Sequence, residues 1–225
     1  PYNNVHFRKA LAYGIQRNEI IKYKMEGLAK PATSILSPLS PFHSHELKPL
    51  TFDLKQAKQE LKLSGFDINK TLHLKTSNSQ ESVGIGKVLI QQLKKIGLNI
   101  KLRSFEWGTY YNDLKKGLFE MATMRWVGVI DPDIYRIALH SQEIPPGRNR
   151  GGYRNTIFAQ LVEDGLKIAN PEKRKKHYKE VQKIILNELP IIPLWYNQKV
   201  AIVNKKVKNY RPSANGDFLH LIHAC

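Results

Sequence analysis

Residues 71–105 read TLHLKTSNSQESVGIGKVLIQQLKKIGLNIKLRSF, and this stretch decides the fold. Thr71–Thr76 alternates apolar and polar side chains, as a half-buried strand does. Ser79–Ile96 then has the spacing of an amphipathic helix, and Gly97 ends it. Leu98–Phe105 alternates again. A strand, a helix and a strand with short connections predict a right-handed βαβ unit with parallel strands, so the fold class is α/β.

The residues that follow extend this unit and lead into a polar loop. Glu106–Lys116 is predicted to form a helix and Phe119–Val127 a strand, which runs into the sequence MATMRWVGVIDPD at 121–133. Loops that leave strand ends are where α/β proteins place ligand sites, because a rigid sheet positions a mobile polar tip. Trp126 stands there beside Arg125, which favours a pocket wall over a core position for this ring.

The flanking segments predict mainly helices. His6–Glu26 has apolar spacing for one or two helices that Gly27 ends, and Lys30–Leu50, with four prolines, predicts a long extended loop of functional type. Further predicted elements are a helix from Asp53 through Leu63, helices over Thr156–Ala169 and Pro171–Leu189 with Asn170 as the N-cap, a strand over Ile191–Tyr196, and its hairpin partner over Val200–Val203.

The charge of the chain is +17, from 36 Lys and Arg against 19 Asp and Glu. Such an excess suggests an anionic partner. Its Lys and Arg spread along the whole chain in short runs such as Lys173–Lys176, whereas a nucleic-acid module concentrates them on one element. A basic module that binds nucleic acid or an anionic surface is therefore the alternative, and a nucleic-acid partner is not expected. Apolar runs are too short for a transmembrane helix, and the opening Pro1-Tyr2-Asn3-Asn4 suggests a piece of a longer polypeptide.

Candidate catalytic and metal-binding residues are few. Gly84-Ile85-Gly86-Lys87 lacks the remaining spacing of a phosphate loop and falls inside a predicted helix. Two groups have ligand-type side chains at close spacing, namely His43-Ser44-His45-Glu46 and the set His220, His223 and Cys225. Neither matches a zinc motif, so we expect a solvent-exposed loop and a frayed tail. A hydrolase or transferase using His140 or the His43/His45 pair is the least favoured hypothesis. No enzyme activity, metal or cofactor is predicted.

Six segments, in order along nearly the whole chain, resemble one protein family. They are NNVHFRKALAYGIQRNEII (3–21), GLAKPATSILSP (27–38), FDLKQAKQELKLSGF (52–66), IQQLKKIGLNIKLRSFEWGTYYNDLKKGLFEMATMRWVGVIDPD (90–133), NRGGYRNTIFAQLVEDG (149–165) and NPEKRKKHYKEVQKIILNELPIIPLWYN (170–197). This set is similar to the C-terminal lobe of the periplasmic substrate-binding proteins of ABC importers, in the class that binds oligopeptides, dipeptides and nickel (solute-binding protein family 5).

The resemblance implies a fold, a domain organisation and partners. The expected fold is a periplasmic-binding-protein-like lobe of type II (cluster C), with a mixed sheet flanked by helices and with the N-terminal lobe absent from this chain. Residues 1–206 would form the ligand-binding lobe, and 207–225 a return segment toward the missing lobe. The protein would bind a peptide or other small solute and deliver it to the permease subunits of an ABC importer. It would be periplasmic or otherwise extracytoplasmic, either free or as a membrane-anchored lipoprotein.

The resemblance also implies site residues and one departure. Trp126 matches the family Trp that lines the ligand cleft, and Asn149 and Tyr153 match a loop that faces the same cleft. Asp131 and Asp133 match a DPD sequence expected to cap and to accept hydrogen bonds. Peptide-binding members place an Asp at the position of Val129, where it pairs with the ligand's α-amino group, and Val129 cannot form that pair. The loop is one residue shorter here, and the alternative is that Asp131 substitutes for the missing Asp after a loop shift. The expected ligand-binding residues are Arg125, Trp126, Asp131, Arg148, Asn149 and Tyr153, with Arg150 and Arg154 adding to basic surroundings that suit an anionic ligand.

Overall fold

The computed structural model describes residues 1–213 and 221–222. Its centre is a parallel sheet with the strand order β3-β2-β4, made of β2 (Thr71–Ser77), β3 (Asn99–Phe105) and β4 (Met121–Ala122). Leu74 of β2 lies opposite Leu102 of β3 on one side and Met121 of β4 on the other. The predicted βαβ unit and the α/β class are therefore confirmed.

Two helices cross over between these strands, α4 (Gln80–Lys94) from β2 to β3 and α5 (Trp107–Lys115) from β3 to β4. The two crossovers run in opposite directions across the sheet, so right-handed connections place the helices on opposite faces. The predicted signals set the ends of α4: the Ser79 side chain accepts a hydrogen bond from the backbone N–H of Ser82, and Gly97 adopts a φ of +97° after the helix.

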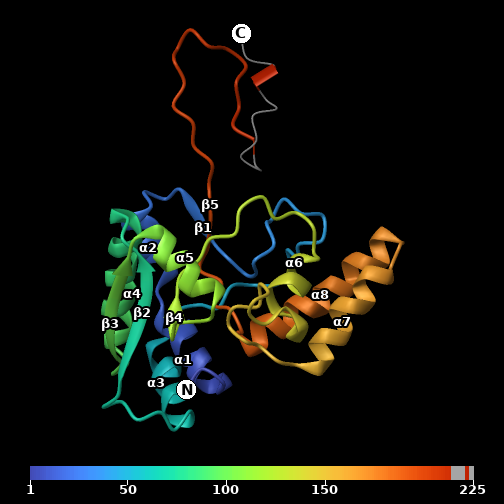
Figure 1. Ribbon diagram of the computed structural model, residues 1–225. Coiled ribbons are helices and arrows are strands. Elements are labelled where there is room, and N and C mark those ends of the chain that lie inside the picture. Colours follow the sequence, from blue (N-terminus) through green and yellow to red (C-terminus); the bar gives the residue numbers. More distant parts are fainter. Residues whose placement is uncertain (214–220, 223–225) are drawn as a thin grey trace.

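The remaining helices form two groups around the sheet (Figure 1). Near the sheet lie α1 (Val5–Gly14), α2 (Arg17–Lys24) and α3 (Leu54–Leu63), the last capped by Asp53. The other half of the molecule holds α6 (Ile134–Leu139), a short 3₁₀ helix (Ser141–Glu143), α7 (Thr156–Lys167) and α8 (Pro171–Glu188). As predicted, the Asn170 side chain caps α8, accepting a hydrogen bond from the N–H of Lys173.

Each of these halves contains an apolar cluster of its own. The first lies between the sheet and α1, α3 and α4, and includes Phe7, Leu74 and Leu93. The second lies among α6, α7 and α8, where Tyr135 and Tyr178 are both fully buried with ring centroids 6.2 Å apart. Burial of large side chains dominates the stability of such a unit, so each half has its own core.

Three predicted strands differ from the observed ones. The strand expected over Phe119–Val127 is limited to β4, and the strand expected over Ile191–Tyr196 is β5 (Trp195–Asn197). Val200–Val203 was expected to pair with that strand as a hairpin, and this expectation is wrong. The partner of β5 is β1 (Ala29–Pro31), antiparallel to it, within the long loop near the start of the chain.

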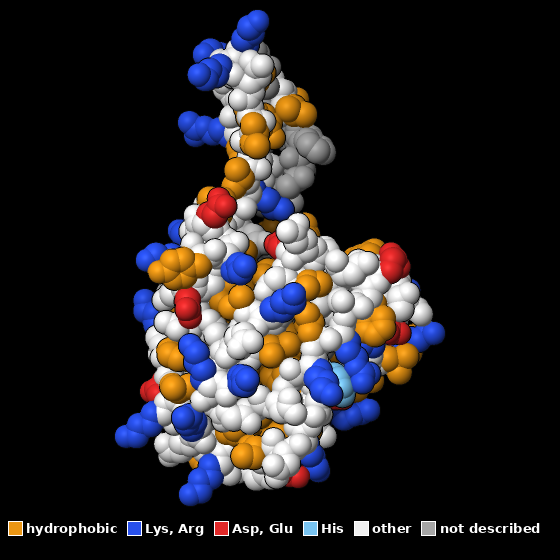
Figure 2. Space-filling view, turned by 90° about the vertical axis from the view of Figure 1, so that its left-hand side faces the viewer, with side chains coloured by type: hydrophobic (Ala, Val, Ile, Leu, Met, Phe, Trp, Pro, Cys, Tyr) orange, Lys and Arg blue, Asp and Glu red, His pale blue; other side chains and the backbone are white. Residues whose placement is uncertain are grey.

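After β5 the chain leaves the body as a protruding segment, residues 198–213 (Figure 1). It carries Lys and Arg but no Asp or Glu, and Ile202 in it is 102% exposed. Figure 2 shows basic side chains both on this segment and scattered over the body, rather than gathered on one element of the face in view. Within the described residues, no helix is both long and apolar enough to cross a lipid bilayer.

Candidate functional site

The carboxyl ends of the three parallel strands lie at one edge of the sheet. In open α/β sheets this edge is the usual place for a ligand. At the exit of β2, the hydroxyls of Ser77 and Ser79 both lie within hydrogen-bond distance of Ser82, at 3.0 and 2.8 Å. At the exit of β3, the Glu106 carboxylate accepts hydrogen bonds from the first N–H groups of α5, at 2.7 and 3.3 Å. These groups start the two crossover helices and line the edge with polar atoms.

The exit of β4 is the loop that contains Trp126. Its start is fixed because the Tyr110 hydroxyl donates a hydrogen bond to the Thr123 carbonyl. Trp126 and Val129 are partly buried and pack against the second apolar cluster. Arg125 is exposed and forms an ion pair with Glu81 of α4 at 3.2 Å. Trp126 thus lies between the core and the surface, while the Arg125 charge is already matched by a carboxylate.

The two aspartates after this loop have different roles. An Asp131 oxygen accepts a hydrogen bond from the backbone N–H of Asp133 at 2.8 Å, and the same oxygen lies 3.6 Å from Arg174. The expectation that Asp131 accepts a hydrogen bond within the loop is therefore confirmed. Asp133 makes no side-chain cap bond to α6. It instead pairs with Arg136 one turn along that helix, at 2.8 Å, so the expected capping role for its side chain is wrong.

Asn149 lies in the loop between the 3₁₀ helix and α7, and its side chain is fully buried. Its amide nitrogen donates to the carbonyls of Leu139, His140 and Tyr153, and its amide oxygen accepts the N–H of Tyr153. An unpaired buried amide is costly, and this one is satisfied from its own loop. The Asn149 side chain therefore shapes the loop in this structure, whereas the sequence suggested that it faces a ligand.

Tyr153 is partly buried, and its ring meets Phe158 edge-on, with centroids 5.5 Å apart. Its hydroxyl donates to the Glu188 carboxylate at the end of α8, and burial together with that carboxylate raises the pKa of Tyr153. Arg125 thus points to α4 while Tyr153 points to α8, so these two predicted residues contact different elements. Arg148, between them in sequence, is exposed and forms no ion pair with any described residue.

Two aromatic residues of α5 lie at the surface. The structure leaves Trp107 59% exposed, stacked on Tyr111, and brings Arg150 over the same Tyr111 ring. Glu81 and Glu188 are site contacts that the sequence did not reveal, because no local pattern pairs them with residues so distant in the chain. The spacing of Trp107 and Tyr111, one helical turn apart, was the available signal for the stack.

The surroundings of His43 differ from those expected. The sequence suggested a solvent-exposed loop, but His43 is buried, with its Nε2 3.2 Å from the Thr33 hydroxyl and 3.3 Å from the Tyr196 hydroxyl. Burial, aided by the neighbouring His45, lowers the pKa of His43 to about 4. Among the described residues no three His, Cys, Asp or Glu side chains come together as a metal site would require. His220, His223 and Cys225 lie outside the described residues.

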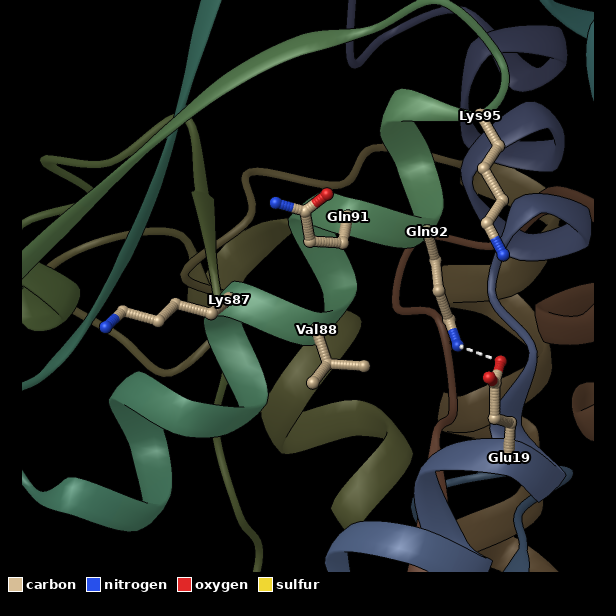
Figure 3. Close-up of a pocket in the computed structure, with 6 residues that line it drawn as sticks. All are labelled: Glu19, Lys87, Val88, Gln91, Gln92 and Lys95. Carbon is tan, nitrogen blue, oxygen red and sulfur yellow. Dashed lines mark hydrogen bonds between the residues drawn. The ribbon is translucent and has the colours of Figure 1, made fainter.

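Two hollows lie away from this edge. A groove of about 220 Å³ lies between α2 and α4, lined by Glu19, Lys87, Val88, Gln91, Gln92 and Lys95. Figure 3 shows Gln92 turned toward Glu19, to which it donates a hydrogen bond at 3.1 Å, so these two lining side chains are paired with each other. A second hollow of about 470 Å³ lies beside the start of α7 and is lined by Ser141, Arg154, Asn155, Thr156 and Ile157.

The sequence and fold match a known family. Residues 1–143, more than half of the chain, match the model of the bacterial extracellular solute-binding proteins, family 5, middle region. The chain belongs to this family. The resemblance drawn from its six segments is thereby confirmed. The family is described as solute-binding proteins. The two relatives described below are likewise named as binding proteins, and neither is named as an enzyme.

Curated relatives cover nearly all of this family 5 chain. The heme-binding protein A of Haemophilus influenzae is 26% identical over an alignment 225 residues long, which covers 96% of this chain and 41% of the relative. The dipeptide-binding protein DppE of Bacillus subtilis is 26% identical over an alignment 220 residues long, which covers 92% of this chain and 40% of the relative. The chain thus spans about 40% of the length of these relatives.

Solved structures agree on the fold. The periplasmic binding protein DppA of Helicobacter pylori, in complex with the peptide STSA, superposes with a TM-score of 0.85 at 28% identity, over 93% of this chain and 42% of that one. The oligopeptide-binding protein AppA of Bacillus subtilis gives 0.86 at 24% identity, covering 99% of this chain and 47% of that one, and supports the fold alone. The expected periplasmic-binding-protein-like lobe is confirmed.

Proposed function

We propose that this chain is the C-terminal lobe of an extracytoplasmic solute receptor that binds a peptide or other small solute and delivers it to the permease of an ABC importer. The match of residues 1–143 to family 5 carries the proposal. Relatives named for dipeptides, and a neighbour that holds the peptide STSA, support a peptide ligand. The name of the Haemophilus relative supports a wider range of solutes.

A second lobe on the same polypeptide is part of this proposal. The chain spans about 41% of its relatives, which leaves room for such a lobe in a protein of their length. Residues 1–206 are proposed as the ligand-binding lobe and 207–225 as the return toward the other one. The protruding segment supports this, because its exposed apolar residues, Ile202 above all, lack a cover in the described body. A cleft between two lobes would enclose most of a small ligand.

The proposed ligand wall is the exit of β4 together with the loop before α7. Trp126 supplies a flat apolar face, Arg125 and Asp131 supply exposed charges on the same loop, and Arg148 supplies one on the loop before α7. Asn149 and Tyr153 set the shape of the neighbouring loop through hydrogen bonds rather than through free polar atoms. Val129 packs against the core and has no carboxylate to pair with a ligand's amino group. We therefore propose a ligand that is held without the amino clamp of peptide-binding members.

The proposed receptor carries no catalytic chemistry, metal or cofactor of its own, and it works outside the cytoplasm, either free or anchored as a lipoprotein. Family membership supports this placement, since the family is described as extracellular solute-binding proteins. Its partners are the solute, the permease and the other lobe. Nucleic acid is not among them, because Lys and Arg occur in short runs along the whole sequence and are scattered over the face that Figure 2 shows, whereas a nucleic-acid module concentrates them on one element.

Thermal unfolding of the complete polypeptide tests the proposal. A solute that binds only the folded state raises the melting temperature in proportion to the logarithm of its concentration above its Kd. We expect such a rise for a member of a library of peptides, peptide derivatives and metal chelates, and none for DNA at low salt. The absence of a shift across the library, or a shift for DNA that disappears as salt is raised, would contradict the receptor function.

A further inference from the structure

A stripe of exposed aromatic and cationic side chains runs along α5. Trp107 and Tyr111 are one helical turn apart, and their rings stack with centroids 5.7 Å apart and planes 14° from parallel. Lys115, one turn further, holds its ammonium 5.3 Å from the Tyr111 centroid. Trp107 is 59% exposed and Tyr111 38%, so this stack is offered to solvent instead of filling the core.

Arg150 comes to the same stack from the loop before α7. Its guanidinium carbon lies 5.1 Å from the Tyr111 ring centroid, and it also contacts the sulfur of Met124. The loop reaches α5 by packing over Gly117, where an added Cβ would lie 3.7 Å from the Arg150 carbonyl and where φ is +70°. We call Trp107, Tyr111, Met124 and Arg150 the α5 shelf.

The charge of Arg150 has no carboxylate partner among the described residues. Its Nε–H is buried and lacks a hydrogen-bond acceptor there. Carboxylates on and beside α5 are already used: Glu106 accepts the N–H groups at the start of the helix, and Asp113 pairs with Lys75 at 2.9 Å. The shelf therefore combines a flat apolar surface with an unmatched guanidinium. Its chemical complement is a carboxylate attached to an apolar or aromatic group.

We propose that the α5 shelf binds the carboxylate-bearing apolar end of a small solute. The apolar group lies against the Trp107 and Tyr111 stack, while the carboxylate accepts hydrogen bonds from Arg150. This inference rests on the proposed function and names the class of ligand for the lobe, an anionic solute with an apolar end. It also agrees with the absence of a carboxylate at Val129, because a solute that is recognised through its acid end needs no free amine.

Two matched probes test the inference on the 225-residue chain. N-acetyl-phenylalanine has the ring and the carboxylate, whereas N-acetyl-phenylalaninamide replaces the carboxylate with a neutral amide. Both lack a free amine. Titration at millimolar concentration suits such small ligands. The readout is the Trp107 indole N–H resonance, assigned with Trp107→Phe. We expect the acid to shift this resonance with an affinity about tenfold higher than the amide, because a charge-assisted pair is lost in the amide.

Variants distinguish binding at the α5 shelf from a general attraction of the acid to the positive charge of the chain. Arg150→Gln should weaken the acid about tenfold, to the level of the amide, and leave the amide unchanged. Trp107→Ala should weaken both probes, observed through neighbouring resonances of α5. Lys116→Gln is the matched control, because it removes an equal charge from an exposed residue at the end of α5 that contacts no ring. An unchanged affinity is expected there.

Three results would overturn the inference: equal affinity for the two probes, an equal loss in Lys116→Gln and Arg150→Gln, or no movement of the Trp107 resonance. These results are distinct from failure of the receptor function. If library solutes stabilise the complete polypeptide while Trp107 does not respond to the acid, the receptor stands and the shelf is wrong. If Trp107 responds as expected but no solute stabilises the polypeptide, the shelf stands and the receptor function is wrong.

Discussion

The Tyr153 hydroxyl donates a hydrogen bond to the Glu188 carboxylate at 2.5 Å, which fastens the loop before α7 to the last turn of α8. The same carboxylate accepts from Asn155 at 2.8 Å, and the Glu188 carbonyl accepts from Arg8 of α1 at 2.7 Å. One residue thus joins the loop, the second core and the first helix. The position of Arg150 on the α5 shelf depends on this loop, so Glu188 influences the proposed site without facing it.

Glu188→Ala should lower the free energy of unfolding by about 1–3 kcal/mol, because two donors lose a charged acceptor. Glu188→Gln keeps one acceptor oxygen and should lose less. Urea unfolding monitored by circular dichroism measures both. Equal stability of Glu188→Ala and the parent would show that the connection contributes nothing to the fold.

Tyr153 should make stability depend on alkaline pH. Burial and the Glu188 carboxylate raise its pKa above the ordinary 10.0. A raised pKa stabilises the fold fully below the unfolded value, and this contribution is lost as pH rises above 10 toward the folded value. Tyr153→Phe should therefore flatten part of the fall in unfolding free energy above that pH. Tyr23→Phe, at an exposed ring, is the control, and a profile for Tyr153→Phe that coincides with it would contradict the prediction.

His43 should make stability depend on acid pH, with the opposite sign. Its pKa is lowered from 6.5 to about 4, so its contribution is present above pH 6.5 and lost as pH falls toward 4. The full loss amounts to about 3 kcal/mol at 1.36 kcal/mol per pKa unit. In His43→Gln the unfolding free energy should change less steeply with pH between these two values. His45→Gln, at the exposed neighbour that is the smaller cause of the lowered pKa, should keep most of this slope, and an equal slope in all three proteins would exclude His43 as its source.

Asn149→Ala should destabilise the protein by about 2–3 kcal/mol, because three carbonyls and one N–H lose their partner inside a buried loop. Arg148→Gln changes the exposed residue beside it and should stay within about 0.5 kcal/mol of the parent. Equilibrium unfolding and the rate of proteolysis within residues 143–155 measure the difference. If proteolysis there proceeds equally in both variants, Asn149 is not what holds this loop.

Two glycines inside helices should respond oppositely to alanine. A Cβ at Gly84 of α4 would meet nothing within 4 Å. Gly84→Ala should therefore stabilise the protein by about 0.5–1 kcal/mol, because alanine lowers the conformational entropy of the unfolded chain. A Cβ at Gly165 of α7 would lie 2.8 Å from the buried Tyr178 ring, so Gly165→Ala should destabilise by about 1–3 kcal/mol. Thermal and urea unfolding compare the pair. A stabilised Gly165→Ala would mean that α7 shifts freely against α8.

Local signals in the sequence were sufficient for the helices and the parallel sheet. Ser79, Asn170 and Gly97 act through atoms within a few residues, so their roles could be predicted. The β1–β5 pair could not, since it joins Ala29 to Asn197 and depends on tertiary packing. The burial of His43 was missed for the same reason, because its partner Tyr196 is 153 positions away.

In the candidate site, too, the features set by local patterns were predicted and the long-range contacts were not. The place of Trp126 at a strand exit was foreseen because strand alternation and loop polarity are local patterns. Neither the buried amide of Asn149 nor the Tyr153–Glu188 bond could be foreseen, since the sequence does not show which backbone atoms a polar side chain reaches. Arg150 was recognised only as part of a basic neighbourhood. Its place over Tyr111 depends on two loops meeting at Gly117.

The protruding segment has a practical consequence for handling the chain. Val200 and Ile202 are 63% and 102% exposed on backbone that pairs with no strand of the described body. Uncovered apolar residues on free backbone act as a template for another copy of the same segment. We therefore expect preparations of this chain alone to self-associate through residues 198–203 as concentration rises, and we expect Ile202→Lys to keep them dispersed.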